Sequence, residues 1–182
     1  MVIGVTIEGI SPLLMHSPSA LSNDQASTGR KTQKPTPKED AEAGAYRLDD
    51  GTLYQPAEHL EAAMAAAAKD FKEKSTRRSL GNLLPAMVEI EPRCIPHGTK
   101  DYEIDSRPVR VQSARVIRHR PRLDKWSLSF RIILDDEIIS PIQLREIVDR
   151  AGKRQGIGDF RPACRGKFGK FVVTKWETIS NK

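Results

Sequence analysis

The sequence is short of cysteine, and this shortage excludes several classes of protein. Its two cysteines, Cys94 and Cys164, lie far apart and form no CxxC pair, which argues against a zinc ribbon and against a disulfide framework. The four histidines show no HExxH or similar spacing, so we expect no metal site and no cofactor. So few cysteines are typical of a reducing compartment, and we predict a cytoplasmic location.

Long apolar runs are also missing. No stretch is long enough to cross a bilayer, and the first ten residues lack the charged start and long apolar core of a signal peptide, so we expect no membrane partner. The chain has 182 residues, which suits a single domain over residues 1–182. Its net charge of +6 suits an anionic partner and equally suits an ordinary basic surface.

The spacing of apolar residues predicts the first and last parts of the fold. Alternation predicts a strand over 2–10 and another over 170–179. Helical spacing predicts one helix over 57–74 and a second over 141–156, each opened by a proline, and Ser140 is expected to cap the second. The apolar stripe of the second helix is predicted to be Ile142, Leu144, Ile147, Val148 and Ala151.

The middle of the chain is predicted to be a long hairpin. Residues 109–123 alternate with one slip near 113–114, which indicates a bulge, and residues 125–134 are the expected partner strand. The resulting order predicts an α+β fold of the ferredoxin-like βαββαβ type, with an antiparallel sheet, helices on one face and insertions. The other face of that sheet would be free to meet a partner, as in RNA-recognition domains.

Two insertions interrupt this plan. Residues 17–44 are rich in Ser, Thr, Pro, Gly and Lys and contain almost no large apolar residue, so we expect a flexible insertion. A second insertion is expected at 83–105, where 83–92 is predicted to be a strand and the remainder irregular. Residues 45–56 are predicted to form a short hairpin with an Asp-Gly turn.

Residues 106–122 contain six arginines and one histidine but no acidic residue. The guanidinium group presents a planar fork of donors that fits phosphate oxygens. We therefore predict that this stretch binds a nucleic-acid backbone, and the alternative is a strand face whose arginines extend into water. The candidate contacts are Arg107, Arg110, Arg115 and Arg118.

The stretch GIGDFRPACRGKFGKF, residues 156–171, combines four glycines with four basic residues and one acid. Glycines let backbone N–H groups approach an anion, and Arg161, Arg165, Lys167 and Lys170 would add side-chain donors. The alternative is a flexible lead-in to the last strand. The stretch lacks the spacing of a Walker A loop and precedes a strand, which excludes a dinucleotide-binding turn. Aromatic residues make up only 5 %, which favours backbone binding over base stacking.

Catalytic motifs are missing as well. We find no GxSxG sequence and no Cys/His pair, so a protein without enzymatic activity is favoured. His16 follows the first predicted strand, where it could face a substrate. Asp24 and Asp40 lie in the predicted 17–44 insertion, and loop aspartates of this kind are usually only solvated.

Three stretches resemble the RAMP superfamily of CRISPR-associated proteins, in particular the backbone subunits that polymerise along guide RNA. The first is IEGISPLLMHS, residues 7–17, which is similar to the first strand and following loop of the family. The second is DDGTLYQPAEHLEAAM, residues 49–64, which looks like the family's hairpin, proline and helix. The third is the glycine-rich stretch 156–171, and the three occur in the order of the family.

The resemblance implies a modified RNA-recognition fold with a palm-like sheet and a β-hairpin thumb, formed by residues 116–126 or 83–105. It implies a ribonucleoprotein of antiviral defence in which guide RNA, further copies of this chain and other subunits of a CRISPR effector complex are the partners. His16 and the eight basic candidates named above would contact RNA.

Three alternatives stay open at this stage. One is a RAMP-type endoribonuclease that processes guide RNA, with His16 as general acid or base. Another is a phage-type single-stranded DNA-binding protein. The last is an assembly protein whose basic face meets an acidic protein partner.

Overall fold

A four-stranded antiparallel sheet forms the centre of the protein. The computed structural model describes residues 1–20, 35–73, 77–111 and 114–179, with the backbone alone for residues 110, 111 and 114. Every neighbouring pair of strands is antiparallel, which confirms the predicted α+β class with antiparallel strands. In their order across the sheet, the strands are β4 (Val88–Glu91), β8 (Ser127–Leu134), β1 (Val2–Gly9) and β9 (Phe171–Ile179).

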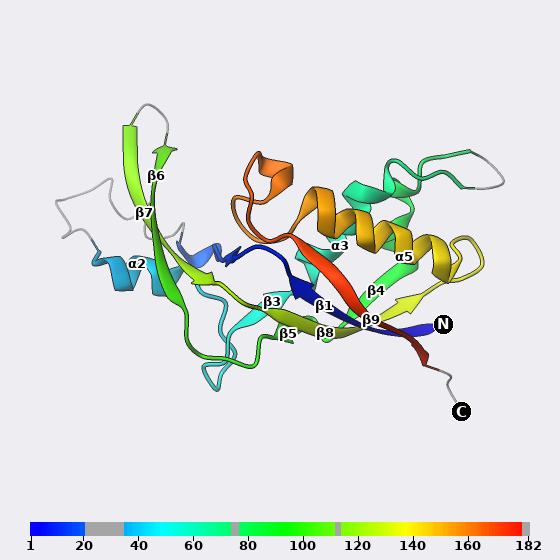
Figure 1. Cartoon of the computed structure of the whole chain (residues 1–182), viewed down its shortest axis with the longest axis horizontal. Coiled ribbons are helices and arrows are strands. Elements are labelled where there is room, and N and C mark those ends of the chain that lie inside the picture. The colour runs from blue at the N-terminus through cyan, green and yellow to red at the C-terminus, as the bar shows by residue number, and fades with distance from the viewer. Residues whose placement is uncertain (21–34, 74–76, 112–113, 180–182) are drawn as a thin grey trace.

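Two helices cover one face of this sheet. Helix α3 (Ala57–Ala68) lies between β1 and β4 in the chain, α5 (Pro141–Arg150) lies between β8 and β9, and Figure 1 shows both on the same side. The Ser140 hydroxyl accepts a hydrogen bond from the Gln143 N–H, so α5 begins where the sequence predicts. No helix in the described part of the chain is long and apolar enough to span a membrane.

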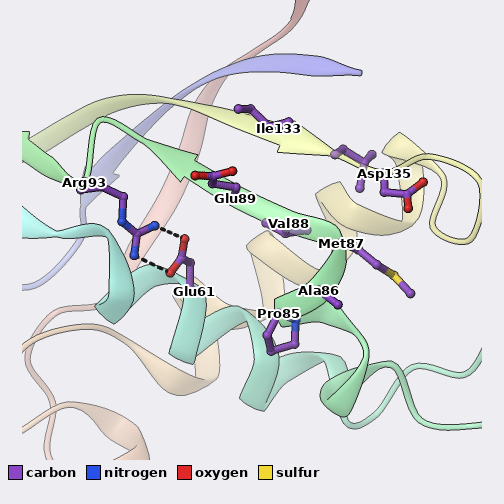
Figure 2. A pocket seen from close by; sticks show the side chains of 10 residues that line it. Glu61, Pro85, Ala86, Met87, Val88, Glu89, Arg93, Ile133 and Asp135 are labelled. Atoms are coloured by element: carbon purple, nitrogen blue, oxygen red, sulfur yellow. Dashed lines mark hydrogen bonds and ion pairs between the residues drawn. The ribbon is translucent and has the colours of Figure 1, made fainter.

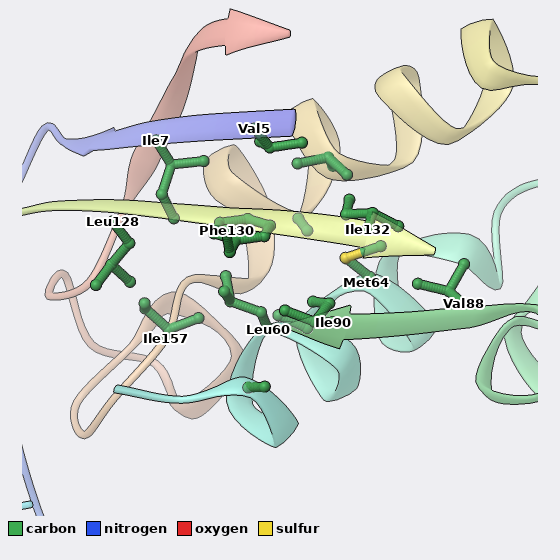
Figure 3. Packing of buried hydrophobic residues seen from close by; sticks show 14 of the residues in the cluster. Val5, Ile7, Leu60, Met64, Val88, Ile90, Leu128, Phe130, Ile132 and Ile157 are labelled. Carbon is green, nitrogen blue, oxygen red and sulfur yellow. The ribbon is translucent and has the colours of Figure 1, made fainter. Parts of the chain in front are cut away.

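The core lies between these helices and the sheet. Ile7 of β1 and Phe130 of β8 point to the same face as Leu60 and Met64 of α3, and Figure 3 shows these side chains packed together. Because successive strand side chains alternate between faces, the apolar face of each strand is buried and its polar face is exposed. Ile142 is 76 % exposed, so its predicted place in the apolar stripe of α5 is wrong, although the other four members of the stripe are buried.

The opposite face of the main sheet is polar and carries both signs of charge. Arg131 lies 3.2 Å from Glu91, and Lys175 lies 3.0 Å from Glu177. Thr6 lies between these pairs and its hydroxyl contacts that of Ser129 at 3.0 Å. Because these cations are matched by carboxylates, this face offers no excess of positive charge for a phosphate backbone.

A second sheet carries the arginine-rich stretch. Strand β6 (Glu103–Val111) pairs with β7 (Ala114–Leu123), and β2 (Leu13–Leu14) pairs with the far end of β7. The long β6–β7 hairpin points away from the main sheet in Figure 1, and α2 (Pro37–Ala43) packs against β7. The predicted pairing of 109–123 with 125–134 is therefore wrong, because β8 pairs with β1 and β4 instead.

The error has a simple cause. Val111 pairs with Ala114, so the chain reverses between them, where the sequence suggested a bulge in a continuous strand. A tight reversal shifts the alternation of side chains by one residue, and a bulge does the same. The pattern of apolar residues cannot distinguish the two.

The remaining short elements also change parts of the prediction. Residues predicted as one strand at 83–92 form helix α4 (Leu84–Met87) followed by β4. The stretch predicted as irregular contains β5 (Cys94–Pro96), which pairs with β3 (Tyr54–Pro56), and the beginning of β6. The Asp-Gly turn is present, with a single bridge between Arg47 and Leu53. Single helical turns occur at Leu80–Asn82, Ala151–Gln155 and Pro162–Cys164.

The predicted insertion at 17–44 contains helix α2, so the expectation of a loop is wrong for that part. Thr36 caps α2 through a reciprocal capping box with Glu39. Asp40 is buried, and its Oδ2 accepts a hydrogen bond of 2.8 Å from the backbone N–H of His119 in β7. Asp40 thus holds α2 against the hairpin, whereas Asp24 lies outside the described residues.

We expect Leu60→Ala to lower the free energy of unfolding by about 2–5 kcal/mol, because it removes buried methyl groups and leaves a cavity in the core. Ile142→Ala in the exposed face of α5 is the control, with an expected change within about 0.5 kcal/mol. Urea unfolding followed by circular dichroism measures both. Equal effects of the two substitutions would contradict this assignment of the core.

His97 predicts a pH dependence of stability. Burial lowers the pKa of His97 to about 4, and neither ring nitrogen has a hydrogen-bond partner among the described residues. Between about pH 6.5 and 4, His97 therefore binds a proton in the unfolded chain but not in the folded chain. The free energy of unfolding consequently falls as the pH falls. Between pH 7 and 5 we expect the free energy of unfolding to fall by about 2 kcal/mol because of His97. This part of the pH dependence should be absent from the His97→Gln variant. Unfolding curves at both pH values check this, and identical losses in the two proteins would refute it.

Candidate nucleic-acid interface

The glycine loop, defined here as residues 156–170, is docked on the turn that follows β1. The N–H of Gly169 donates to the carbonyl of Pro12 at 2.8 Å, and the N–H of Asp159 donates to that of Leu14 at 2.9 Å. Within the loop, Ile157 N–H donates to the carbonyl of Gly169 at 3.0 Å. These N–H groups are already bonded inside the protein, so the cradle of backbone donors that the sequence suggested is not open to an anion.

The glycines serve this close docking. At Gly169 the backbone φ is +66°, and a Cβ atom would lie 1.8 Å from the carbonyl oxygen of Ile157. At Gly158 φ is +74°, and a Cβ atom would lie 2.4 Å from the carbonyl oxygen of Leu14. Only glycine fits both the dihedral angle and the space. The glycine content therefore reflects backbone packing, and any anion would be bound by side chains.

The fold brings carboxylates to the acid-free arginine stretch. Four of its arginines lie within 3.9 Å of a carboxylate oxygen supplied by another segment or by a flanking residue. The pairs are Arg107 with Asp105, Arg118 with Asp40, Arg120 with Asp159, and Arg122 with Asp124. Although residues 106–122 contain no acidic residue, carboxylates therefore balance the arginines at the base of the hairpin. Two of the predicted RNA contacts, Arg107 and Arg118, are among these paired residues.

Two phenylalanines join the glycine loop to the hairpin. The guanidinium carbon of Arg107 lies 4.4 Å from the ring centre of Phe168 and 5.9 Å from that of Phe160. On the neighbouring strand, the guanidinium carbon of Arg120 lies 5.1 Å from the Phe160 ring centre. Stacks of this kind fix a guanidinium over an aromatic face. Residues from β6, β7 and the glycine loop thus form one connected surface.

Arg120 is the most deeply buried charge of this surface, at 7 % exposure. Its Nε lies 2.6 Å from Asp159 Oδ2, but the N–H is not aligned with the oxygen, and Nη1 has no hydrogen-bond partner among the described residues. A buried guanidinium depends strongly on its counter-ion. The Arg120–Asp159 ion pair therefore anchors the glycine loop to β7.

The exposed cations lie further out on the same two elements. Arg115 near the tip of the hairpin and Arg165 and Lys167 in the glycine loop are exposed, and Lys170 and Arg161 are partly buried. None of these five forms an ion pair with a carboxylate in the described ranges. Arg110 pairs with Arg115 in the hairpin register, but its side chain lies outside the described part of the structure.

His16 lies at the other end of the hairpin. It is partly buried just after β2, and its carbonyl accepts a hydrogen bond of 3.2 Å from the Tyr46 hydroxyl. Its neighbours Met15 and Ser17 bond to Pro121 in β7 and to Gly44 after α2. Within the described residues, no group of three or more His, Cys, Asp or Glu side chains is placed to hold a metal ion.

A groove in the described part of the chain lies away from this surface. It encloses about 580 Å³ beside the edge strand β4, and Figure 2 shows its lining. Glu61 accepts a hydrogen bond from the outward N–H of Ile90 and pairs with Arg93 at 2.5 Å. These side chains occupy the strand edge, and with Glu89 and Asp135 also in its lining the groove is acidic. An occupied strand edge and an acidic lining are both unsuited to binding a nucleic-acid backbone.

Comparison with known proteins adds no family to this picture. A scan against models of protein families gives no match, and a search of curated proteins gives none either. The RAMP resemblance therefore stays a prediction.

Sequence reasoning missed the residues that assemble this surface. Arg120, Asp159, Phe160 and Phe168 act through contacts between distant segments, which the sequence does not reveal. The one available signal was the pair of phenylalanines placed among the cations of the glycine loop.

Asp159→Ala tests the anchor. The substitution leaves the Arg120 guanidinium buried without its counter-ion, so we expect a loss of about 2–4 kcal/mol in the free energy of unfolding. Asp124→Ala is the matched control, since it breaks an ion pair of the same 2.6 Å length that is far more exposed, and it should cost less than about 1 kcal/mol. Thermal or urea unfolding gives both values. A loss as small as that of the control would show that the anchor is unimportant.

Proposed function

We propose that the chain binds single-stranded RNA across the surface formed by the β6–β7 hairpin and the glycine loop. One observation supports this most directly: exposed cations without ion pairs lie on two elements that the Arg107–Phe168 contact fixes to each other. Positive charge without a protein partner is what a phosphate backbone neutralises, with release of counterions. The contacts that we assign to phosphates are Arg115, Arg165, Lys167 and Lys170.

We further propose that the fold is of the ferredoxin-like βαββαβ type and that the β6–β7 hairpin occupies the place of a thumb. The strand order β4-β8-β1-β9, with α3 and α5 as the connecting helices, supports this assignment. The hairpin extends from the main sheet as a separate arm (Figure 1).

On this basis we propose a guide-RNA-binding backbone subunit of a CRISPR-type ribonucleoprotein, with copies arranged along the RNA beside other subunits. The three stretches that carry the resemblance support it, because they meet in space. The turn in residues 7–17 receives the glycine loop through Pro12 and Leu14, and helix α3 from residues 49–64 lies beside the same loop. In such a subunit base pairing of the guide supplies sequence specificity, and the protein holds the backbone.

Sequencing the RNA that co-purifies with the chain, expressed together with its flanking genes, tests this role. A uniform RNA with a repeat-derived end is the expected result. Random RNA, or equal amounts of DNA, would contradict the guide-binding role and would favour a general single-strand binder.

Arg165→Ala/Lys167→Ala removes two of the proposed phosphate contacts. We expect RNA affinity at about 0.1 M salt to fall at least tenfold, and the slope of log affinity against log salt to decrease by about 1.4, since each contact to a single strand contributes about 0.7. Fluorescence anisotropy with a labelled 15-mer of uridine measures both quantities.

The matched control is Arg131→Ala/Lys175→Ala, which removes the same charge from the open face of the main sheet. We expect less than a twofold change in affinity from this variant. A larger loss in the control than in the glycine-loop variant would place the RNA on the main sheet and contradict the proposal.

A further inference from the structure

A small cavity lies between helix α3 and the glycine loop. It encloses about 200 Å³, and residues of α3, of the turn after α5 and of the glycine loop line it. These residues are His59, Ala62, Ala63, Ala66, Gln155, Ile157, Gly158, Arg161 and Ala163. Typical ligand pockets enclose about 300–1,000 Å³, so this cavity accommodates a small planar group rather than a whole nucleotide.

Polar groups of fixed orientation reach this cavity. The Gln55 side-chain nitrogen lies 2.5 Å from Nδ1 of His59, and the Tyr46 ring packs edge-on at 5.6 Å, so the imidazole is held on two sides. Burial and the nearby Arg161 charge lower the pKa of His59, so the ring is neutral at pH 7 and offers a hydrogen-bonding nitrogen without charge. Gln155 adds an amide, which both donates and accepts.

Arg161 supplies the directional donors. Its Nη1 donates to the carbonyl of Gly158 at 3.0 Å, which orients the guanidinium, and it forms no ion pair with a carboxylate in the described part of the chain. Its remaining N–H groups are therefore available to a ligand. The methyl groups of Ala62, Ala63 and Ala66 give the cavity an apolar wall from α3.

We propose that this cavity binds one unstacked base of the bound RNA and prefers guanine. The inference rests on the proposed RNA-binding function and adds a specific contact to it. Single-stranded RNA is read through bases turned out of the stack, and a guanidinium fork matches the two acceptors O6 and N7 of guanine. Adenine presents an amino donor in place of O6, which meets the guanidinium donors unfavourably.

Such a contact has a consequence for how the RNA lies on the protein. Binding of phosphates alone lets a strand slide, because every phosphate is the same. A base held in the cavity fixes the register of the strand on each copy of the protein. Because the cavity shares the glycine loop with Arg165 and Lys167, the base and the adjacent phosphates can be bound together.

The test compares four labelled 15-mers: oligouridine, and the same chain with one central guanosine, adenosine or abasic site. We expect the guanosine RNA to bind at least about fivefold more tightly than the adenosine RNA. Arg161→Lys keeps the charge and loses the fork, and Ala62→Leu fills the cavity from an exposed helix position. Both should abolish the preference for guanosine over adenosine. Ala86→Leu, an exposed alanine of α4, is the control that should keep the preference.

The outcomes separate the two proposals. Tight binding of all four RNAs with equal affinity, or a preference that survives both substitutions, overturns the base site and leaves the RNA-binding surface standing. If none of the RNAs binds, the proposed function fails, and titration with guanosine 5′-monophosphate then decides the cavity alone. Saturating shifts of the Gly158 amide and His59 ring resonances, stronger than with adenosine 5′-monophosphate, support it; no shift up to about 10 mM overturns it.

Discussion

The backbone contact between the glycine loop and the turn after β1 is the constraint on which the rest of the surface depends. At Gly158 the loop backbone approaches that of Leu14 so closely that no side chain fits between them, and the N–H of Gly169 donates to the carbonyl of Pro12. This docking carries Asp159 and Phe160 to Arg120, and Phe168 to Arg107, which fixes the base of the hairpin. The same docking closes the small cavity against α3. The packed backbone of the loop therefore holds its side chains in place and does not itself bind phosphate.

The distribution of charge follows from this arrangement. Arginines at the base of the hairpin meet carboxylates from β6, α2 and the glycine loop, so they stabilise the junction between segments. Cations further out, at Arg115, Arg165 and Lys167, have no such partner among the described residues and face solvent. A net charge of +6 is thus concentrated on one arm and one loop, while the open face of the main sheet is balanced. This separation of paired and unpaired cations favours a nucleic-acid partner over an ordinary basic surface.

The sequence predicts the local features well and the contacts between distant segments poorly. Strand β1, helix α3 and the Ser140 cap of α5 follow from periodicity and capping, which act over a few residues. The reversal between Val111 and Ala114 escaped prediction because a turn and a bulge shift the alternation equally. The ion pairs of Asp40 and Asp159 were not predicted because both residues are distant in sequence from the arginines that they contact. The glycines were assigned to anion binding because the packing of their loop against Pro12 and Leu14 leaves no local signal in the sequence.

The most direct test of the account is to map where bound RNA touches the protein. Ultraviolet cross-linking of a photoreactive uridine RNA, followed by mass spectrometry of the peptides, locates the contacts. We predict cross-links in residues 157–170 and 103–123, with few in β1 and β8. Cross-links concentrated on the open face of the main sheet, at residues 127–131, would contradict it and assign the arginine-rich hairpin to another role.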